Sequence, residues 1–263
     1  MAIVPLSKEK HSHLLLGPLD LRAFSNLLSI PVYFHEIRDL ACDFPLFLSV
    51  TDDIVGLRLL CNIDTESSSP YINAEGGWRG RYVPIYLRQQ PFTAASIENS
   101  DRKTIFIDDE SPRFCEEGEL LFENSEPTEL LQNIMEDLGF LLNSGKRTQL
   151  MLDTLKKFEL ITPWELDIKS EDGLEVKFSD LHRINEAALN ELNIDGWSEL
   201  KQCYAFPIIY GQLLSMGNIQ KLVFLKNSTI KQDQNKGLQL DVSEGNLDFE
   251  LNEDSQSLNF DNV

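Results

Sequence analysis

Three arginines and three aromatic residues within eleven positions are the first candidates for chemistry in this sequence: Trp78, Arg79, Arg81, Tyr82, Tyr86 and Arg88. Guanidinium groups bind carboxylates through paired hydrogen bonds, and they also stack on aromatic rings. The segment therefore predicts a site that captures a carboxylate or a peptide. The alternative is that the arginines pair with the protein's own acidic residues and the aromatic side chains pack in the core.

Glycines beside this segment give it a superficial likeness to a phosphate-binding loop. Gly76, Gly77 and Gly80 surround Trp78 and Arg79. The segment lacks the lysine of a P-loop, and it does not follow a strand pattern typical of a parallel sheet. We therefore expect no nucleotide site here, and the sequence indicates no cofactor elsewhere.

The four histidines do not complete a metal-binding or catalytic set. His11 and His13 could share one face of a strand, but a third ligand would have to come from a distant part of the chain. His35 and Glu36 begin like a zinc-protease motif, yet Asp39 stands where the second histidine is needed. No serine lies in a G-x-S-x-G turn. We predict no metal site and assign no catalytic residue.

The formal net charge of the chain limits the kinds of molecule that it can bind. The 263 residues include 43 acidic and 23 basic side chains, which gives a formal net charge of −20. Such a protein repels nucleic acid and anionic lipid surfaces. Charges and a proline interrupt the N-terminal residues, so they do not resemble a secretory signal, and no apolar stretch is long enough to span a membrane. We expect a cytoplasmic protein.

Hairpins are expected in the first part of the chain and again before its end. Alternating apolar residues around turn signals predict strand pairs at Phe44–Val50 with Ile54–Cys61, at Phe92–Ile97 with Thr104–Ile107, and at Leu166–Ile168 with Leu174–Phe178. Short helices are expected over 31–42 and between Pro84 and Pro91.

The C-terminal half has helical periodicity. Apolar residues at helical spacing predict one long or kinked helix over 127–160, with Gly145 as its weak point. Two more helices are expected over 185–193 and 196–226, the second interrupted near Pro207. The fold class is therefore α+β, with antiparallel hairpins packed against a C-terminal helical half, in a single domain over 1–228.

The last residues, 229–263, differ from the rest. From Ile230 to Val263 there are eight acidic and two basic residues. This composition indicates a flexible acidic tail, whereas short bursts of alternating apolar residues would also suit strands added to a sheet.

Several blocks of this sequence resemble the SapC family of bacterial proteins, in the same order from about residue 3 to 225. They are Ile3–His11, Trp78–Phe92, Phe106–Pro112, Glu117–Phe122 and Tyr210–Val223. The resemblance implies a bacterial protein of about this length, in a family named for a surface-layer locus. It brings no catalytic residues that could be assigned here.

Two hypotheses follow. The first is a non-enzymatic binding or accessory protein that acts on a polypeptide, with a surface or exported protein as the candidate. Its ligand-binding residues would come from Trp78, Arg79, Arg81, Tyr82 and Arg88, together with His11 and Glu36. The second is an enzyme, or a subunit of one, that modifies a peptide or small metabolite. It would require His11 or Glu36 beside Arg81 in a deep pocket, whereas a shallow groove rimmed by aromatic residues would favour binding. The sequence predicts no oligomeric state.

Overall fold

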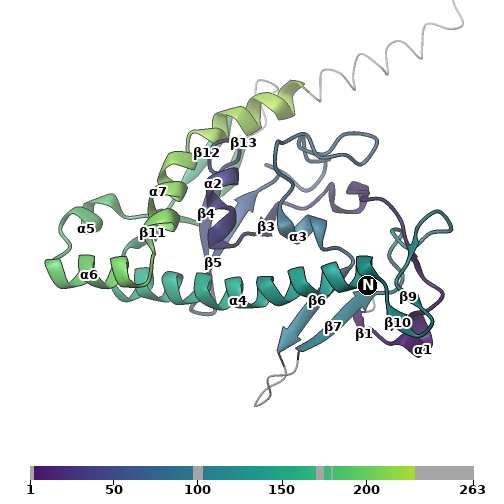
Figure 1. Cartoon of the computed structure of the whole chain (residues 1–263). Coiled ribbons are helices and arrows are strands. Elements are labelled where there is room, and N and C mark those ends of the chain that lie inside the picture. Colours follow the sequence, from purple (N-terminus) through teal and green to yellow (C-terminus); the bar gives the residue numbers. More distant parts are fainter. Residues whose placement is uncertain (1–2, 97–102, 170–174, 179, 229–263) are drawn as a thin grey trace, which may run out of the picture. The chain divides into compact units, whose positions relative to one another are not determined.

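Five antiparallel strands form the main sheet of the structure, a computed structural model that describes residues 3–96, 103–169, 175–178 and 180–228. Their spatial order is β11 (Ile161–Pro163), β14 (Leu181–Ile184), β4 (Leu46–Thr51), β5 (Ile54–Leu60) and β3 (Ser29–Pro31) (Figure 1). The central pair, β4 and β5, is the first predicted hairpin. Asp52 and Asp53 form its turn with φ of 48° and 67°, the left-handed conformation that a two-residue hairpin turn requires.

A second sheet has three strands, in the order β1 (Ile3–Pro5), β7 (Lys103–Asp108) and β6 (Phe92–Ser96). Three further pairs of strands are short: β12 (Leu166–Lys169) with β13 (Glu175–Phe178), β2 (Leu15–Leu16) with β8 (Glu119–Leu120), and β9 (Phe122–Glu123) with β10 (Glu126–Pro127). The pairs β6–β7 and β12–β13 confirm the other two predicted hairpins, whose turns lie outside the described residues.

One long helix, α4 (Glu129–Lys157), runs along both sheets (Figure 1). Its start is fixed by Thr128, whose side-chain oxygen accepts the backbone N–H of Leu131. The predicted helix is confirmed as one long helix and not a kinked pair, because it continues through Gly145 without interruption. A Cβ at Gly145 would lie 3.4 Å from the ring of Tyr33, so this glycine is in packing contact with its neighbour.

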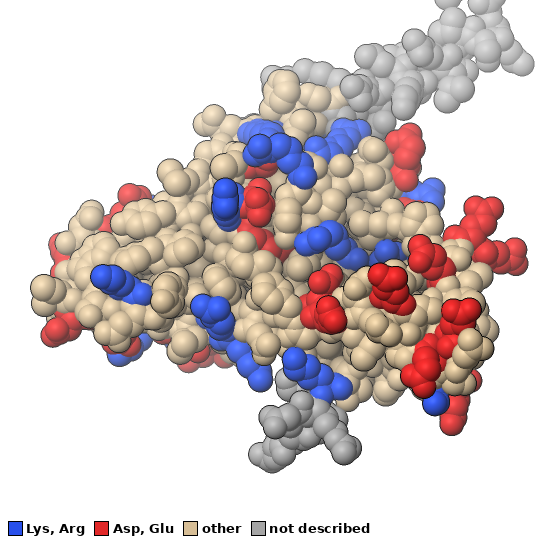
Figure 2. All heavy atoms as spheres, viewed as in Figure 1, with Lys and Arg blue, Asp and Glu red and all other residues tan. Residues whose placement is uncertain are grey.

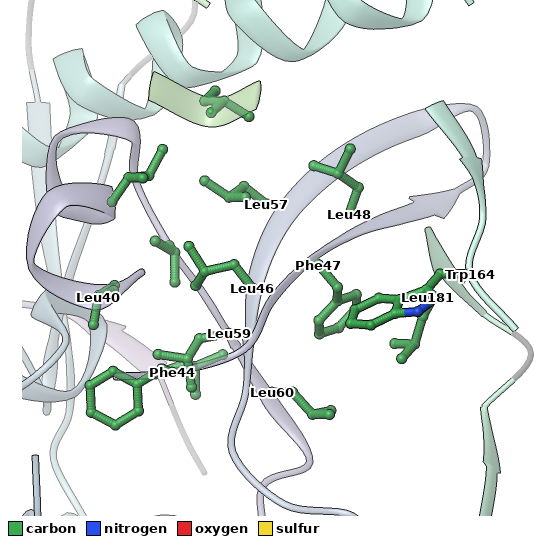
Figure 3. Packing of buried hydrophobic residues seen from close by; sticks show 14 of the residues in the cluster. Leu40, Phe44, Leu46, Phe47, Leu48, Leu57, Leu59, Leu60, Trp164 and Leu181 are labelled. Carbon is green, nitrogen blue, oxygen red and sulfur yellow. The ribbon is translucent and has the colours of Figure 1, made fainter. Parts of the chain in front are cut away.

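The helix α4 joins two hydrophobic cores. Its first half contributes Leu131, Leu138 and Leu141 to the smaller core, which contains Phe92 and Ile107 of the three-stranded sheet. Its second half contributes Met151, Leu152 and Leu155 to the main core. Alternation along β4 and β5 places their leucines in this main core, where Figure 3 shows them with Leu40 and Phe44.

Short helices connect the strands of the first half. They are α1 (Lys8–His11), η1 (Arg22–Phe24), η2 (Phe34–Glu36), α2 (Ile37–Leu40) and α3 (Ile85–Arg88). The helix predicted over 31–42 is thus a 3₁₀ turn followed by one α-helical turn. The helix α3 lies between Pro84 and Pro91, as predicted, and its residues belong to both cores: Ile85 to the smaller and Leu87 to the main one.

The C-terminal half is helical, which completes the predicted α+β class. Its helices are α5 (Glu186–Asn190), α6 (Ile194–Gln202), α7 (Phe206–Ser215) and a last helix over 218–228. The predicted interruption near Pro207 is confirmed, because α6 ends at Gln202 and α7 begins at Phe206, with Pro207 in its first turn. A second break, at 216–217, was not predicted. Residues up to Asn227 form one compact unit. The predicted tail at 229–263 lies outside the described residues.

Candidate functional site

Glu36 is a buried carboxylate that joins two segments of the chain. Its Oε1 accepts the backbone N–H of Ile85 at 2.7 Å and the hydroxyl of Tyr82 at 3.2 Å. Its Oε2 accepts the N–H of Tyr33 at 3.1 Å, at the start of η2. Burial raises the pKa of Glu36, and these three hydrogen bonds oppose that rise. The side chain therefore holds the 82–85 segment against η2.

Tyr82 connects this buried carboxylate to an exposed arginine. Arg88 donates a hydrogen bond from Nη2 to the Tyr82 hydroxyl at 3.1 Å, and its Cζ lies 5.2 Å from the centre of the Tyr82 ring. Burial, followed by the charge of Glu36, raises the pKa of Tyr82 to about 12. The hydroxyl therefore stays protonated at neutral pH, donating to Glu36 while it accepts from Arg88.

Arg81 pairs with an acidic residue of the protein itself. Its Nε lies 3.0 Å from Oδ2 of Asp43, and Lys221 in the helix 218–228 lies 3.0 Å from Oδ1. Hydrogen bonds from Lys221 and Arg81 lower the pKa of Asp43. Because Asp43 is shared by two cations, this cluster has one net positive charge.

Trp78 packs in the protein, whereas its neighbour Arg79 is exposed. The indole ring of Trp78 lies 5.4 Å from the ring of Phe44 and 5.6 Å from that of Tyr71. Arg79 donates its backbone N–H to the carbonyl of Tyr71 at 2.8 Å. Within the described ranges, its guanidinium has no hydrogen bond and no ion pair.

His11 is buried in α1, where its Nδ1 accepts the backbone N–H of Ser7 at 2.9 Å. Burial lowers its pKa, and the charge of Asp109 opposes this effect. The contacts of His11, Glu36 and Arg81 involve different partners, and no hydrogen bond or ion pair joins any two of them in the described part of the chain. Among the described residues, His11, Glu36 and Arg81 are therefore not in direct polar contact with one another.

Some residues between Trp78 and Arg88 therefore fit the packing interpretation of this segment, and others fit the binding interpretation. Trp78 and Tyr86 are partly buried against the main core, and Arg81 binds Asp43, as the packing alternative predicts. Arg79 and Arg88 instead present exposed guanidinium groups that no described acidic residue pairs with. Figure 2 shows basic side chains interspersed with acidic ones over α2 and α3, and mainly acidic side chains at the end that carries β9 and β10.

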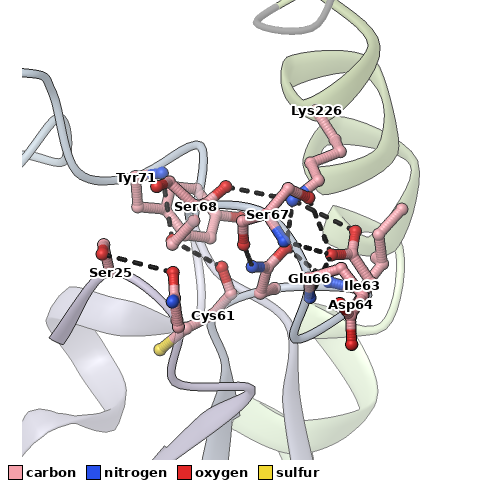
Figure 4. A network of polar contacts seen from close by, with 12 residues as sticks. Ser25, Cys61, Ile63, Asp64, Glu66, Ser67, Ser68, Tyr71 and Lys226 are labelled. Atoms are coloured by element: carbon pink, nitrogen blue, oxygen red, sulfur yellow. Dashed lines mark hydrogen bonds and ion pairs between the residues drawn. The ribbon is translucent and has the colours of Figure 1, made fainter.

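The sequence interpretation missed a buried lysine, Lys226, in the helix 218–228. Its Nζ donates to Oδ1 of Asn62 at 2.7 Å and to the carbonyl of Ser68 at 3.0 Å, and it lies 3.2 Å from Asp64 Oδ2 (Figure 4). Burial lowers the pKa of Lys226, while Asp64 acts to raise it. The sequence pattern that could have revealed it is the helical spacing of Ile219, Leu222 and Lys226, which places the lysine on an apolar face.

His35 was also missed as a partly buried group whose ring nitrogens are buried, although its sequence position was noted. Its ring lies 4.9 Å from the ring of Phe140 on α4 and 6.0 Å from that of Tyr33. Neither ring nitrogen has a hydrogen-bond partner in the described residues. Burial lowers the pKa of His35, and the nearby Arg88 adds to this effect. A neutral imidazole among aromatic rings is therefore a packing group here.

The described residues contain no group of three or more histidine, cysteine, aspartate or glutamate side chains placed to hold a metal ion. None of the helices in the same residues combines the length and apolar character that crossing a membrane requires.

Comparison with known proteins gives one match. The family model described as SapC matches residues 6–222, which include every residue of the candidate site. The chain matches no curated protein and no solved structure.

Proposed function

The chain belongs to the SapC family, and on this premise we propose that it is a non-enzymatic accessory protein that binds a polypeptide. It acts in the bacterial cytoplasm, in the handling of a surface or exported protein. The binding surface is centred on Tyr82 and Arg88, which we call the Arg88 surface, and Arg79 is a further candidate from the same segment. The partner segment contains a carboxylate beside an apolar or aromatic side chain.

The observation that carries this proposal is the fixed position of Arg88. Stacking on Tyr82 and the hydrogen bond to its hydroxyl restrict the guanidinium, and the hydroxyl is itself held by the buried Glu36. An arginine that is already ordered loses less conformational entropy when it binds a carboxylate. One Nη2 hydrogen bond is used within the protein, and the other donors can form a bidentate contact.

The acidity of the whole protein does not prevent an acidic peptide from binding here. At physiological ionic strength charges are screened over about 8 Å. On the face shown in Figure 2, acidic side chains are most numerous at the end that carries β9 and β10, whereas Asp137 lies beside α3 and accepts a hydrogen bond from Gln89 there. Screening weakens the repulsion from the more distant acids, so they oppose the short-range contacts of Arg88 only slightly.

The arrangement of Glu36 supports binding over catalysis. Three donors occupy its two oxygens, and its side chain is fully buried. A general acid or base must reach the proton that it transfers. Glu36 instead orders the residues that present Arg88.

Matched peptides test this proposal. A panel of fluorescein-labelled octapeptides, in pairs that differ only by Glu or Gln beside a Phe, is titrated with the full chain and followed by fluorescence anisotropy. We expect the Glu peptides to bind more tightly, and Arg88→Gln to weaken them about tenfold, as the loss of a charge-assisted hydrogen bond predicts. Equal binding of the Glu and Gln peptides, or unchanged binding by Arg88→Gln, would contradict the proposal.

Arg183→Gln is the matched control, because it removes the same charge from a side chain in β14 whose nearest acid, Glu186, is 3.9 Å away. It should leave peptide binding unchanged. Affinity capture with the wild-type chain and Arg88→Gln in parallel, followed by mass spectrometry, would identify the natural partner as the polypeptide that only the wild type retains.

A further inference from the structure

The short helix η2 is connected to two exposed arginines that belong to different elements. Glu36 accepts a hydrogen bond from the Tyr82 hydroxyl, which in turn accepts one from Arg88. At the other end of η2, the Cζ atom of Arg147 in α4 lies 5.0 Å from the centre of the Phe34 ring. Each guanidinium therefore lies over an aromatic ring that is either part of η2 or hydrogen-bonded to it.

The ring of Phe34 is held close to α4 through its own backbone. The Phe34 N–H donates to Oγ1 of Thr148 at 3.0 Å, and that hydroxyl donates to the carbonyl of Ser144 at 2.8 Å. Arg147 is exposed, and among the described residues no acidic side chain pairs with it. As at Arg88, an aromatic ring restrains the guanidinium while its hydrogen-bond donors stay available.

Two further rings connect the arginines. The ring of His35 lies 5.9 Å from that of Phe34 and 4.9 Å from that of Phe140 on α4. Burial lowers the pKa of His35, and the charge of Arg88 adds to this effect, so that guanidinium lies within electrostatic range of the ring. Phe140 is 55% exposed. An exposed aromatic side chain and its histidine neighbour thus link the contacts of Arg88 to those of Arg147.

The middle of α4 is locally basic in an acidic protein. From Leu138 to Leu152 the sequence contains no aspartate or glutamate, although acidic residues make up 43 of the 263 in the chain. The same run contains Lys146 and Arg147. Asp137, which precedes the run, accepts a hydrogen bond from Gln89. The neighbours of Arg147 along the helix therefore supply no carboxylate that would compete with a ligand for it.

We propose that Phe140 and Arg147 form the second half of the Arg88 surface, and that the partner segment carries two carboxylates with an apolar or aromatic side chain between them. One carboxylate binds Arg88 and the other binds Arg147, each through charge-assisted hydrogen bonds. The side chain between them lies on Phe140 and His35. This partner chemistry rests on the proposed function and narrows its ligand from a single acidic residue to an acidic pair.

Charge complementarity favours a short acidic peptide over other partners. A basic segment would be repelled by both guanidinium groups. Nucleic acid and anionic lipid surfaces also present anions, but they are extended, and a protein with a formal net charge of −20 repels them as a whole. A peptide segment brings two charges to two cations and avoids most of that repulsion, because charges are screened over about 8 Å at physiological ionic strength.

Peptides with two glutamates test this inference. Fluorescein-labelled octapeptides carry a Phe between glutamates that are separated by one, two or three residues, and the full chain is titrated into them with fluorescence anisotropy as the signal. At the best spacing, Arg88→Gln and Arg147→Gln should each weaken binding about tenfold. Replacing one glutamate with glutamine should leave a peptide whose affinity depends on only one of the two arginines.

The two variants separate this inference from the proposed function. If Arg147→Gln leaves binding unchanged at every spacing while Arg88→Gln weakens it, the second half of the surface is refuted and the proposed function stands. Unchanged binding by both variants, or no binding of any peptide, refutes the proposed function as well. Both positions are exposed, so the fold should persist, as far-UV circular dichroism would show.

Matched controls on α4 distinguish contact from general charge. Lys146→Gln removes the same charge from the adjacent exposed residue and should change peptide affinity less than about twofold. Phe140→Ala should weaken binding about threefold or more, whereas Leu150→Ala, at a 59% exposed position, should not. A loss with Lys146→Gln equal to that with Arg147→Gln, or equal effects of the two alanine substitutions, would refute the contact.

The acidic residues from Ile230 to Val263 are the competing occupant, and the full chain can test them. Changing all eight to their amides should alter peptide affinity less than about threefold, since little long-range repulsion remains at physiological ionic strength. A tightening of about tenfold or more would show that this segment competes for the two arginines, and would overturn the assignment of the surface to a partner.

Discussion

Glu36 and Ile85 are 49 residues apart in the sequence, and a single hydrogen bond of 2.7 Å joins them. The same carboxylate accepts a hydrogen bond from the Tyr82 hydroxyl, and that hydroxyl in turn accepts a hydrogen bond from Arg88. Two hydrogen bonds through the Tyr82 hydroxyl thus link the fully buried carboxylate of Glu36 to the exposed guanidinium of Arg88. The position of Arg88 at the surface is therefore tied to a residue that is itself fully buried.

Replacing Glu36 with alanine should destabilise the fold strongly. The change leaves the N–H groups of Tyr33 and Ile85 and the Tyr82 hydroxyl without their acceptor, at about 1–3 kcal/mol for each buried group. We expect the free energy of unfolding to fall by roughly 3 kcal/mol or more in urea denaturation. Glu136→Ala, at an exposed position of α4, is the control. A loss of less than about 1 kcal/mol for Glu36→Ala would show that water replaces the carboxylate.

Asp43 should make the stability depend on acid pH. Its folded pKa is lowered by Lys221 and Arg81, so its contribution is present above the unfolded value near 3.8 and is lost as the pH falls through the folded value. Asp43→Asn should therefore lower the free energy of unfolding by about 1 kcal/mol at neutral pH, because both cations are partly exposed.

The difference between wild type and Asp43→Asn should disappear below the folded pKa, as measured by urea denaturation across the acid range. Asp20→Asn is a useful comparison, since Arg22 also lowers the pKa of Asp20 but at a more exposed site. A difference between wild type and Asp43→Asn that stays constant with pH would mean that the ion pairs contribute nothing to folding.

The candidate site could be predicted only in part from its sequence. Composition identified the segment at Trp78 to Arg88, because cations and aromatic residues are rare neighbours in this chain. It could not show that Arg81 binds Asp43, 38 residues earlier, whereas Arg88 stacks on Tyr82. Sequence spacing says little about partners that the fold brings together, so the two arginines looked equivalent.

At the scale of elements, two helical glycines should respond in opposite ways to alanine. Gly145 lies within α4, where an added Cβ would make an ordinary contact at 3.4 Å with Tyr33. Gly145→Ala should stabilise the protein by up to about 1 kcal/mol, because alanine is the better helix former. Gly211→Ala should destabilise it by about 1–3 kcal/mol, because its Cβ would overlap Ile37.

Thermal unfolding of both variants measures this contrast. Each substitution adds the same methyl group to a helix, so helix propensity alone predicts a gain for both. A stabilised Gly211→Ala would show that α2 moves away from α7 at little cost. A destabilised Gly145→Ala would mean that the contact with Tyr33 has no room for a methyl group.

The elements that the sequence predicted are local, whereas the strands of the main sheet that it missed are not. The β4–β5 hairpin pairs strands separated by the two-residue turn at Asp52–Asp53, so alternation and turn chemistry suffice to identify it. The strands β3, β11 and β14 are three or four residues long, and they join the sheet from distant parts of the chain. Such short segments have no periodicity of their own, and only packing on β4 and β5 makes them strands.

At the scale of the whole described unit, α4 should make the two cores unfold together. The helix contributes side chains to both cores, so loss of packing in one core should also weaken the contacts of α4 in the other. Leu138 lies in the smaller core and Leu155 in the main core, and both are buried. Leu138→Ala and Leu155→Ala should each lower the free energy of unfolding by about 2–5 kcal/mol, with a single transition retained.

The tryptophans make this test selective. Trp78, Trp164 and Trp197 all pack in or against the main core, so their fluorescence reports that core, whereas far-UV circular dichroism reports all helices and strands. If α4 couples the cores, the two signals should coincide in urea for Leu138→Ala, although the substitution is in the core without a tryptophan. Leu150→Ala, at a 59% exposed position of the same helix, should change little. A loss of circular dichroism in Leu138→Ala before any change in fluorescence would show that the smaller core unfolds alone, and that α4 frays from its N-terminal end without affecting the main sheet.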